Sequence, residues 1–199
     1  INYEIWGRWD GNQLTMAEGS IRLHTPQLAI SGNPFLNQFE TQFAWRTVND
    51  QWDLLLENLS LNMYGKAWPA TKILIKNTGP YAHLSTNFLR LEDLSNLFIN
   101  LPLLDKDKQD LLVGLQLMGE MHDTELVINL NNSKHFLIDA SVTNFNTNQW
   151  NSYPALNGFD GHVTFNENRG MAALETRDAS TLWPNLFRSG IDIDKLTGT

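Results

Sequence analysis

The sequence predicts a mainly β protein with a small helical insertion, in which antiparallel strands are interrupted by one helical hairpin at about residues 91–118. Apolar and polar residues alternate with a period of two along most of the 199 residues, as in half-buried strands. Apolar residues at helical spacing occur only in the middle of the chain. Charged residues make up only 18%, while Asn and Thr are abundant, a composition typical of turns and half-exposed strands.

The clearest pair of strands lies at residues 126–143. Residues 126, 128 and 130 are apolar, and the Asn-Asn-Ser sequence at 131–133 is typical of a turn. In the following run the even positions are apolar and the odd positions are largely polar: Phe136, Ile138, Ala140 and Val142 against Leu137, Asp139, Ser141 and Thr143. We therefore expect a β-hairpin.

Further short strands are predicted along the chain. One region changes phase: Trp52, Leu54 and Leu56 keep one alternation, and the apolar positions 59, 61 and 63 keep the opposite one. Such a flip needs one extra residue, so we expect a β-bulge or a strand break near residues 57–58. The glycines at 158 and 161 indicate a turn before the next strand. The other predicted strands cover residues 21–23, 28–30, 39–45, 73–75, 163–165 and 171–174.

The helical insertion is predicted from spacing and end signals. Apolar residues at 91, 94, 97, 98 and 101 share one helical face, and Pro102 would end that helix. Asp105 would cap a second helix carrying Leu111, Leu112 and Leu115 on one side, and Gly119 would stop it.

Composition excludes several classes of function. The net charge of −8 argues against nucleic acid, whose phosphates require Lys and Arg. The absence of Cys excludes disulfides, thiolate metal sites and Cys nucleophiles. No run approaches the roughly 20 apolar residues that a membrane-spanning helix needs. The chain begins at Ile1, and residues 192–198 have the pattern of a further strand and turn, so we expect a segment of a longer protein.

No catalytic, cofactor-binding or metal-binding constellation is recognisable in the sequence. The five histidines lack metal-ligand spacing, and His122 beside Asp123 is more typical of a surface turn. Phosphate-binding and nucleophile-elbow glycine motifs are missing. The 22 acidic residues and 7 Trp leave a carbohydrate cleft open as an alternative, because glycosidase carboxylates need no local motif.

Taken in order, several segments resemble the YhdP subfamily of AsmA-like proteins, which are long periplasmic proteins of Gram-negative bacteria. The resemblance covers most of residues 19–199 and is strongest at residues 156–170, which are similar to a hairpin of that family. The chain departs from the family at Met118, where a Pro is expected. The other similar segments are residues 19–23, 52–61, 91–94, 101–104, 119–121 and 186–187.

The resemblance implies an extended, curled antiparallel sheet that forms an open groove with an apolar interior. It also implies periplasmic localisation, with the full-length protein anchored in the inner membrane, and phospholipid passage between the two membranes. The expected partners are phospholipid acyl chains and flanking segments of the same protein, with strand-edge self-association possible for the fragment. About 12–15 strands span only some 60–70 Å, so residues 1–199 would form one β-rich section of a conduit.

The resemblance brings no catalytic residue, and the residues that would line a groove stay unassigned. Two alternatives stay open beside the lipid conduit. One is a structural or partner-binding β-module, and the other is a carbohydrate-binding domain. A closed core would favour the former, and Trp side chains converging with carboxylates would favour the latter.

Overall fold

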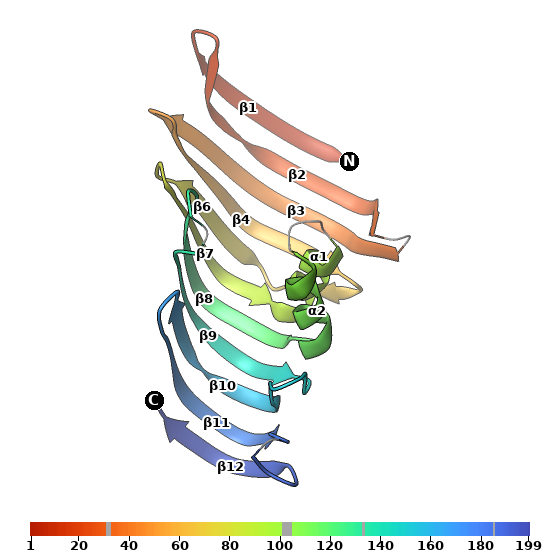
Figure 1. The fold of residues 1–199 in the computed structure, drawn as a ribbon. Coiled ribbons are helices and arrows are strands. Elements are labelled where there is room, and N and C mark those ends of the chain that lie inside the picture. Colours follow the sequence, from red (N-terminus) through yellow and green to blue (C-terminus); the bar gives the residue numbers. More distant parts are fainter. Residues whose placement is uncertain (31–32, 101–104, 133, 185) are drawn as a thin grey trace. The chain divides into compact units, whose positions relative to one another are not determined.

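The computed structural model describes residues 1–30, 33–100, 105–132, 134–184 and 186–199. The strands lie in one 12-stranded antiparallel sheet in the order β1–β2–β3–β4–β6–β7–β8–β9–β10–β11–β12, with β5 beside β4. β1 and β12 stand at the two ends of this order, so the sheet is open. The predicted fold class, mainly β with a small helical insertion, is confirmed (Figure 1).

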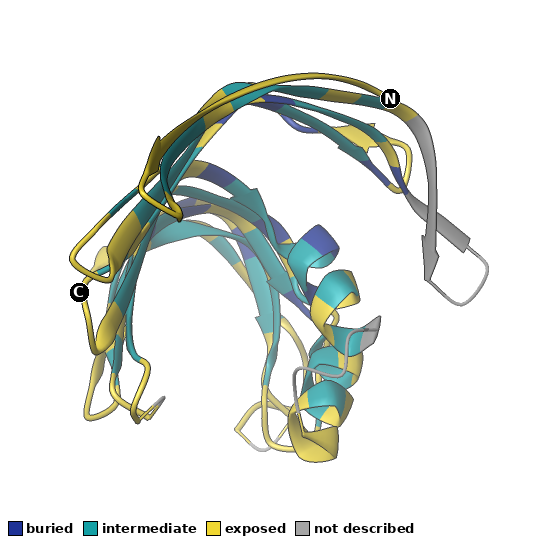
Figure 2. Ribbon diagram, turned by 90° about the horizontal axis from the view of Figure 1, so that it is seen from above, coloured by how far each residue is buried: buried dark blue, intermediate teal, exposed yellow. Residues whose placement is uncertain are grey.

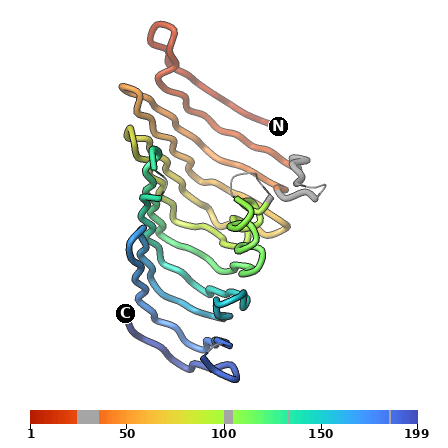
Figure 3. The backbone as a smooth tube through the Cα atoms, in the orientation of Figure 1, coloured from red at the N-terminus to blue at the C-terminus, as the bar shows by residue number. Residues whose placement is uncertain are grey.

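The backbone runs back and forth between consecutive strands (Figure 3). Several predicted short strands are parts of longer ones: residues 21–23 and 28–30 both belong to β2. The strands are β1 (Asn2–Asp10), β2 (Gln13–Ile30), β3 (Asn33–Val48), β4 (Gln51–Met63), β5 (Lys66–Ala67), β6 (Thr71–Asn77), β7 (Tyr81–Arg90), β8 (Met118–Asn129), β9 (Phe136–Thr147), β10 (Ala155–Asn166), β11 (Gly170–Leu182) and β12 (Ile191–Gly198).

The chain divides into two compact units. The first unit comprises Ile1–Phe88 and Thr124–Ile138, and the second comprises Leu89–Asp123 and Asp139–Thr199. The expectation that residues 1–199 form a single section of a larger protein stays a prediction.

The predicted β-bulge lies in β4 of the first unit. Gln42 of β3 pairs with Glu57, whereas Glu40 pairs with Ser60, so one residue of β3 faces two residues of β4. Asn58 has a φ of 51°, a left-handed conformation that Asn tolerates better than most residues. The buried Thr41 hydroxyl lies 3.1 Å from the Glu57 carbonyl oxygen, to which it donates. The phase flip in the sequence is therefore confirmed as a bulge.

A line of similar irregularities crosses β9, β10 and β11 in the second unit. Asn144, Gly158 and Asp178 each have a positive φ within their strands. The Thr176 hydroxyl donates to the Gly158 carbonyl oxygen at 2.8 Å, and the Gly158 N–H donates to the Asn146 side chain at 3.0 Å. Side chains thus replace ladder hydrogen bonds that the bulges interrupt.

The turn predicted at residues 158–161 is wrong, because both glycines lie inside β10. A Cβ on Gly161 would lie 2.5 Å from the Ala173 carbonyl oxygen, so this glycine permits close approach of β11. The predicted turn at His122 and Asp123 is likewise part of β8, with Asp123 in the left-handed conformation. Gly158, Gly161 and Asp123 thus serve left-handed positions and close strand approach within strands, not turns.

The helical hairpin is confirmed as α1 (Leu91–Asn100) and α2 (Lys106–Leu115). Asp105 caps α2 as predicted, accepting from the Lys108 N–H at 3.0 Å. The predicted stop at Gly119 is wrong: α2 ends at Leu115, and Gln116 takes the left-handed position with a φ of 47°. Gly119 belongs to β8, where a Cβ would lie 2.7 Å from the Asn144 carbonyl oxygen. The predicted stop at Pro102 lies outside the described residues.

The buried apolar cores of the two units are small. Figure 2 shows buried residues in short stretches, while most strand positions are half-buried. In the first unit the rings of Trp68 and Phe88 meet edge to face, with centroids 5.4 Å apart. Among the residues whose burial is described, the other buried apolar side chains there are Leu36, Leu59 and Met63, and those of the second unit are Ala140, Val142 and Ala179. Most large apolar side chains therefore lie outside these cores.

Candidate functional site

One face of the first unit is built from rows of apolar side chains. Residues that pair across neighbouring strands project from the same face of a sheet, so the registers define each row. One row crosses β2, β3, β4, β6 and β7 and consists of Ala17, Trp45, Leu54, Ile75 and Leu84. The next row consists of Gly19, Phe43, Leu56, Ile73 and Thr86. We call these two rows the apolar face.

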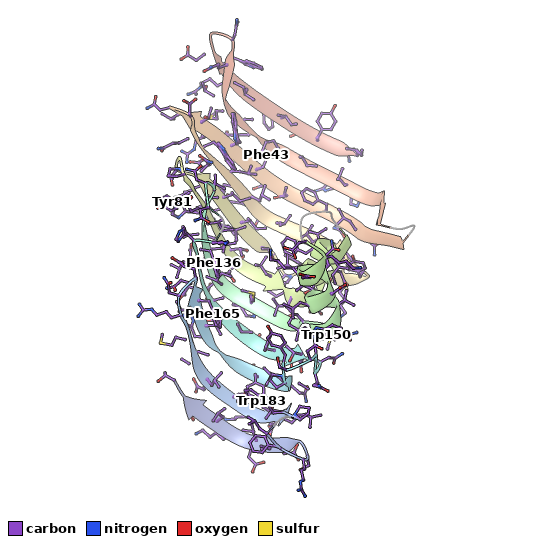
Figure 4. All side chains as sticks on the ribbon, viewed as in Figure 1. Phe43, Tyr81, Phe136, Trp150, Phe165 and Trp183 are labelled. Atoms are coloured by element: carbon purple, nitrogen blue, oxygen red, sulfur yellow. The ribbon has the colours of Figure 1, made fainter. Side chains whose placement is uncertain are left out.

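The large side chains of the apolar face are packed beside one another but are not covered. Phe43 and Trp45 of β3, both leucines of β4 and both isoleucines of β6 are half-buried rather than buried. Figure 4 shows Phe43 on β3. An apolar surface of this extent that stays partly open to water is typical of a binding surface.

The opposite face of the same strands is mainly polar. Arg46 of β3 forms a two-pronged ion pair with Asp53 of β4, at 3.0 and 3.1 Å. Arg22 of β2 pairs with Glu40 of β3, and this hydrogen bond lowers the pKa of the Glu40 carboxyl. Leu55 and Leu74 are apolar exceptions on this face. The ion pairs are solvent-exposed and therefore contribute little to stability, but they mark the face that meets water.

The second unit repeats this division with smaller apolar residues. Val163 pairs with Ala172, and Gly161 pairs with Leu174. Ala140 and Val142 of β9 are buried, and they alternate with the polar residues of that strand. The apolar side of this unit therefore combines small residues such as Ala172 and Gly161 with the larger Val163 and Leu174.

The polar side of the second unit holds a Ser–His–Asp group that sequence reasoning missed. The His162 ring lies between Asp139 (3.1 Å from Nε2) and Ser141 (3.4 Å from Nδ1). The Thr164 hydroxyl donates to Asp139 at 2.6 Å. This bond, and then that of His162, lower the pKa of the Asp139 carboxyl.

This group has the residue types of a hydrolase triad but not its environment. The side chains of Asp139 and His162 are 39% and 45% exposed, so water solvates their charges. Hydrolase triads activate serine with a buried carboxylate and oriented oxyanion donors. We interpret the group as cross-strand polar pairing on the water-facing side. The period-two alternation at residues 138–143 places Asp139 and Ser141 on one face, but nothing local indicates that His162 lies opposite them.

The tryptophans of the first unit differ in their surroundings. Trp45 lies among aliphatic residues on the apolar face, and Trp52 pairs with Thr47 and Asn77 on that face. Trp68 is buried against Phe88. The carboxylates of Asp53 and Glu57 belong to the opposite face. Trp52 and Asp53 nevertheless line one pocket, and Trp6 lines another with Glu4 and Glu18, so the carbohydrate-binding alternative stays open.

Among the described residues, no group of three or more His, Asp or Glu side chains is placed to hold a metal ion. Within the same part of the chain, no helix has the length and apolar composition needed to cross a bilayer.

Within the second unit, the helical hairpin is held by polar contacts and by the ring of Trp150. Asp93 of α1 is buried and pairs with Arg90 at 3.4 Å. The Leu115 carbonyl oxygen at the end of α2 accepts from the Asn148 N–H at 2.7 Å. The ring of Trp150 lies against Gly114 of α2 (Figure 4). A pocket of about 400 Å³ between the two helices is lined by apolar and polar residues, among them Ile99, Leu112 and Asn96.

Comparison with known proteins gives one result. A family model described as YhdP protein matches residues 1–199. Neither a curated protein nor a solved structure matches the chain significantly.

Proposed function

We propose, from the premise that this chain belongs to the YhdP family of AsmA-like bacterial envelope proteins, that it is a non-enzymatic section of a phospholipid conduit. In this proposal the full-length protein is anchored in the inner membrane and lies in the periplasm. It supports phospholipid transport between the inner and outer membranes, and thereby the barrier function of the outer membrane. The observation that carries the proposal is the uncovered apolar face of the first unit.

Acyl chains match the chemistry of the apolar face. Each methylene that leaves water gains about 0.8 kcal/mol, so a chain of about 15 methylenes shielded over half its surface gains roughly 6 kcal/mol. The row through Trp45, Leu54 and Ile75 offers adjacent apolar side chains without an intervening charge. Such a surface holds a chain without fixing its position, which movement along a conduit requires.

The unpaired edges of the sheet suggest the neighbouring partners. β1 and β12 stand at the ends of the strand order, and each presents backbone N–H and C=O groups that another strand could pair with. We propose that flanking segments of the same full-length protein pair there. In the isolated chain the same edges would favour self-association.

Two adjacent positions on opposite faces of β6 provide the test. Ile75 belongs to the apolar face, and Lys76 pairs with Asp53 and His83 on the polar face. A photoreactive phenylalanine analogue would be placed at each position in turn in the full-length protein in cells. After irradiation, we expect a phospholipid adduct at position 75 and at most a trace at position 76.

Two outcomes would contradict the proposal. Equal labelling at both positions would indicate non-specific contact, and no lipid at position 75 would favour a structural β-module. A charge introduced by Ile75→Glu should lower lipid capture at Leu54, its pairing neighbour, whereas Lys76→Glu should not. Enzymatic function is not required at any step of this proposal.

A further inference from the structure

Two loops of the second unit lie side by side at one end of its strands. One joins β9 to β10 and the other joins β11 to β12. Ala155 at the start of β10 pairs with Leu182 at the end of β11, and Thr181 pairs with Ile191 at the start of β12. Figure 4 shows Trp150 and Trp183 at this end, and Phe165 at the opposite end of β10. The loops therefore form one rim, which we call the aromatic rim.

The second of these loops presents three large apolar side chains on a single turn. The Trp183 carbonyl oxygen accepts from the N–H groups of Leu186 and Phe187, both at 2.9 Å. The three side chains therefore lie within one short turn of the chain. Their exposed fractions are 39%, 64% and 44%, and Tyr153 of the neighbouring loop is 50% exposed. Ordered backbone hydrogen bonds thus display apolar groups to the outside.

The charge around the aromatic rim differs from that of the rest of the chain. The whole chain carries a net charge of −8. Residues 140–159 contain no charged side chain, and in residues 179–191 the only charged side chain is that of Arg188. The two loops are thus neutral to weakly positive, with Asp192 of β12 as the next charged residue after Arg188, and this suits a lipid surface with zwitterionic or anionic headgroups.

We infer that the aromatic rim inserts into the headgroup region of a phospholipid bilayer. Trp and Tyr favour this region because their rings are apolar and their N–H or O–H groups reach water. Leu186 and Phe187 would enter the upper acyl region, and Arg188 would lie at phosphate level. The inference rests on the proposed function in that it supplies a place where lipid could pass between a membrane and the protein.

A protein partner is the competing occupant of an exposed aromatic cluster. Protein interfaces surround their apolar centre with a polar rim that orients the partner. The two loops carry Arg188 as their only charged group, and their remaining polar groups are amides and hydroxyls. A bilayer needs no such orientation, so these observations favour lipid.

Vesicle flotation with the 199-residue chain tests the inference. The variant Trp183→Ser/Leu186→Ser/Phe187→Ser changes the rim, and Trp6→Ser/Trp9→Ser removes similarly exposed aromatic area from β1 as a matched control. With vesicles of phosphatidylethanolamine and phosphatidylglycerol at 3:1, we expect the rim variant to bind roughly tenfold or more weakly. The control should change less than about twofold. Arg188→Glu should weaken binding to these vesicles and leave binding to pure phosphatidylcholine vesicles unchanged.

Three results would overturn the inference. The first is absence of vesicle binding by the unaltered chain, and the second is an equal loss in the control variant. The third is a protein rather than a lipid adduct from a photoreactive residue at position 186 in cells. Circular dichroism of each variant verifies that the sheet is retained.

The proposed function can fail separately from this inference. If the rim variant loses vesicle binding while position 75 still captures detergent-dispersed phospholipid, both are supported. Vesicle binding without capture at position 75 would contradict the conduit and leave the rim standing. Capture at position 75 without vesicle binding would support the conduit and contradict membrane insertion of the aromatic rim.

Discussion

Gly114 provides a test of how the helical hairpin is held in the second unit. Within a helix such as α2, Gly→Ala normally stabilises by about 1 kcal/mol, because Ala restricts the unfolded backbone. At this position an added Cβ would lie less than 3.0 Å from three ring atoms of Trp150, a separation that real contacts do not reach. The ring or the helix must therefore move.

The magnitude follows from these two opposing effects. Overpacking against a ring costs about 1–3 kcal/mol. The helix gain of about 1 kcal/mol offsets part of this cost, so the effect of Gly114→Ala should lie between neutral and a loss of about 2 kcal/mol in the free energy of unfolding. In a Trp150→Ala background the obstacle is gone, and the same substitution should stabilise by about 1 kcal/mol. The coupling between the two sites is then about 1–3 kcal/mol.

Urea unfolding followed by far-ultraviolet circular dichroism measures all four proteins of this double-mutant cycle. Circular dichroism is preferred to tryptophan fluorescence because two of the four proteins lack Trp150. The reasoning would be refuted if Gly114→Ala stabilised by the same amount in both backgrounds. That result would mean that the Trp150 ring does not pack on α2 in solution.

Three further predictions concern the sheet. Leu59→Ala should lower the free energy of unfolding by about 2–5 kcal/mol, because Leu59 is only 2% exposed. In the same urea titration, Leu137→Ala at a 39% exposed site should lower it by less than about 1 kcal/mol. Asn58→Gly should change the free energy of unfolding by less than about 0.5 kcal/mol. Asn58→Val should lower it by about 1–2 kcal/mol, because a β-branched residue is strained at a φ of 51°. Equal urea midpoints for the two variants would contradict the bulge. The lowered pKa of Asp139 means that its contribution is present above the unfolded pKa of about 3.9 and is lost as pH falls through the folded pKa, so Asp139→Asn should flatten the acid side of the stability–pH profile.

In the first unit, one side of the sheet carries the apolar face and the other side carries the ion pairs. In the proposed function, acyl chains would take the place of a second layer over the apolar face. In the first unit Ile75 and Lys76 are neighbours in sequence yet belong to faces of opposite chemistry. This arrangement explains why the chain can be rich in apolar residues and still have a small buried core.

Much of the fold could be predicted because short stretches of sequence determine it. The alternation at residues 73–75 and 136–142 marked strands, and the phase flip beside Asn58 marked a bulge, since each is a property of a few successive residues. Asp105 was recognisable as a helix cap for the same reason. The order of weak segments also carried the family resemblance, which the match over residues 1–199 confirmed.

Other features depend on which strands meet, and the sequence by itself did not determine them. Gly119 and Gly161 resembled stop and turn signals, but they serve close approach of a neighbouring strand, which requires knowing that neighbour. The grouping of Asp139 with His162, and of Gly114 with Trp150, joins residues more than 20 positions apart. Period-two alternation tells which residues share a face of one strand. Only the register between strands decides which of them lie together, because backbone hydrogen bonding is compatible with many registers and side-chain packing selects one.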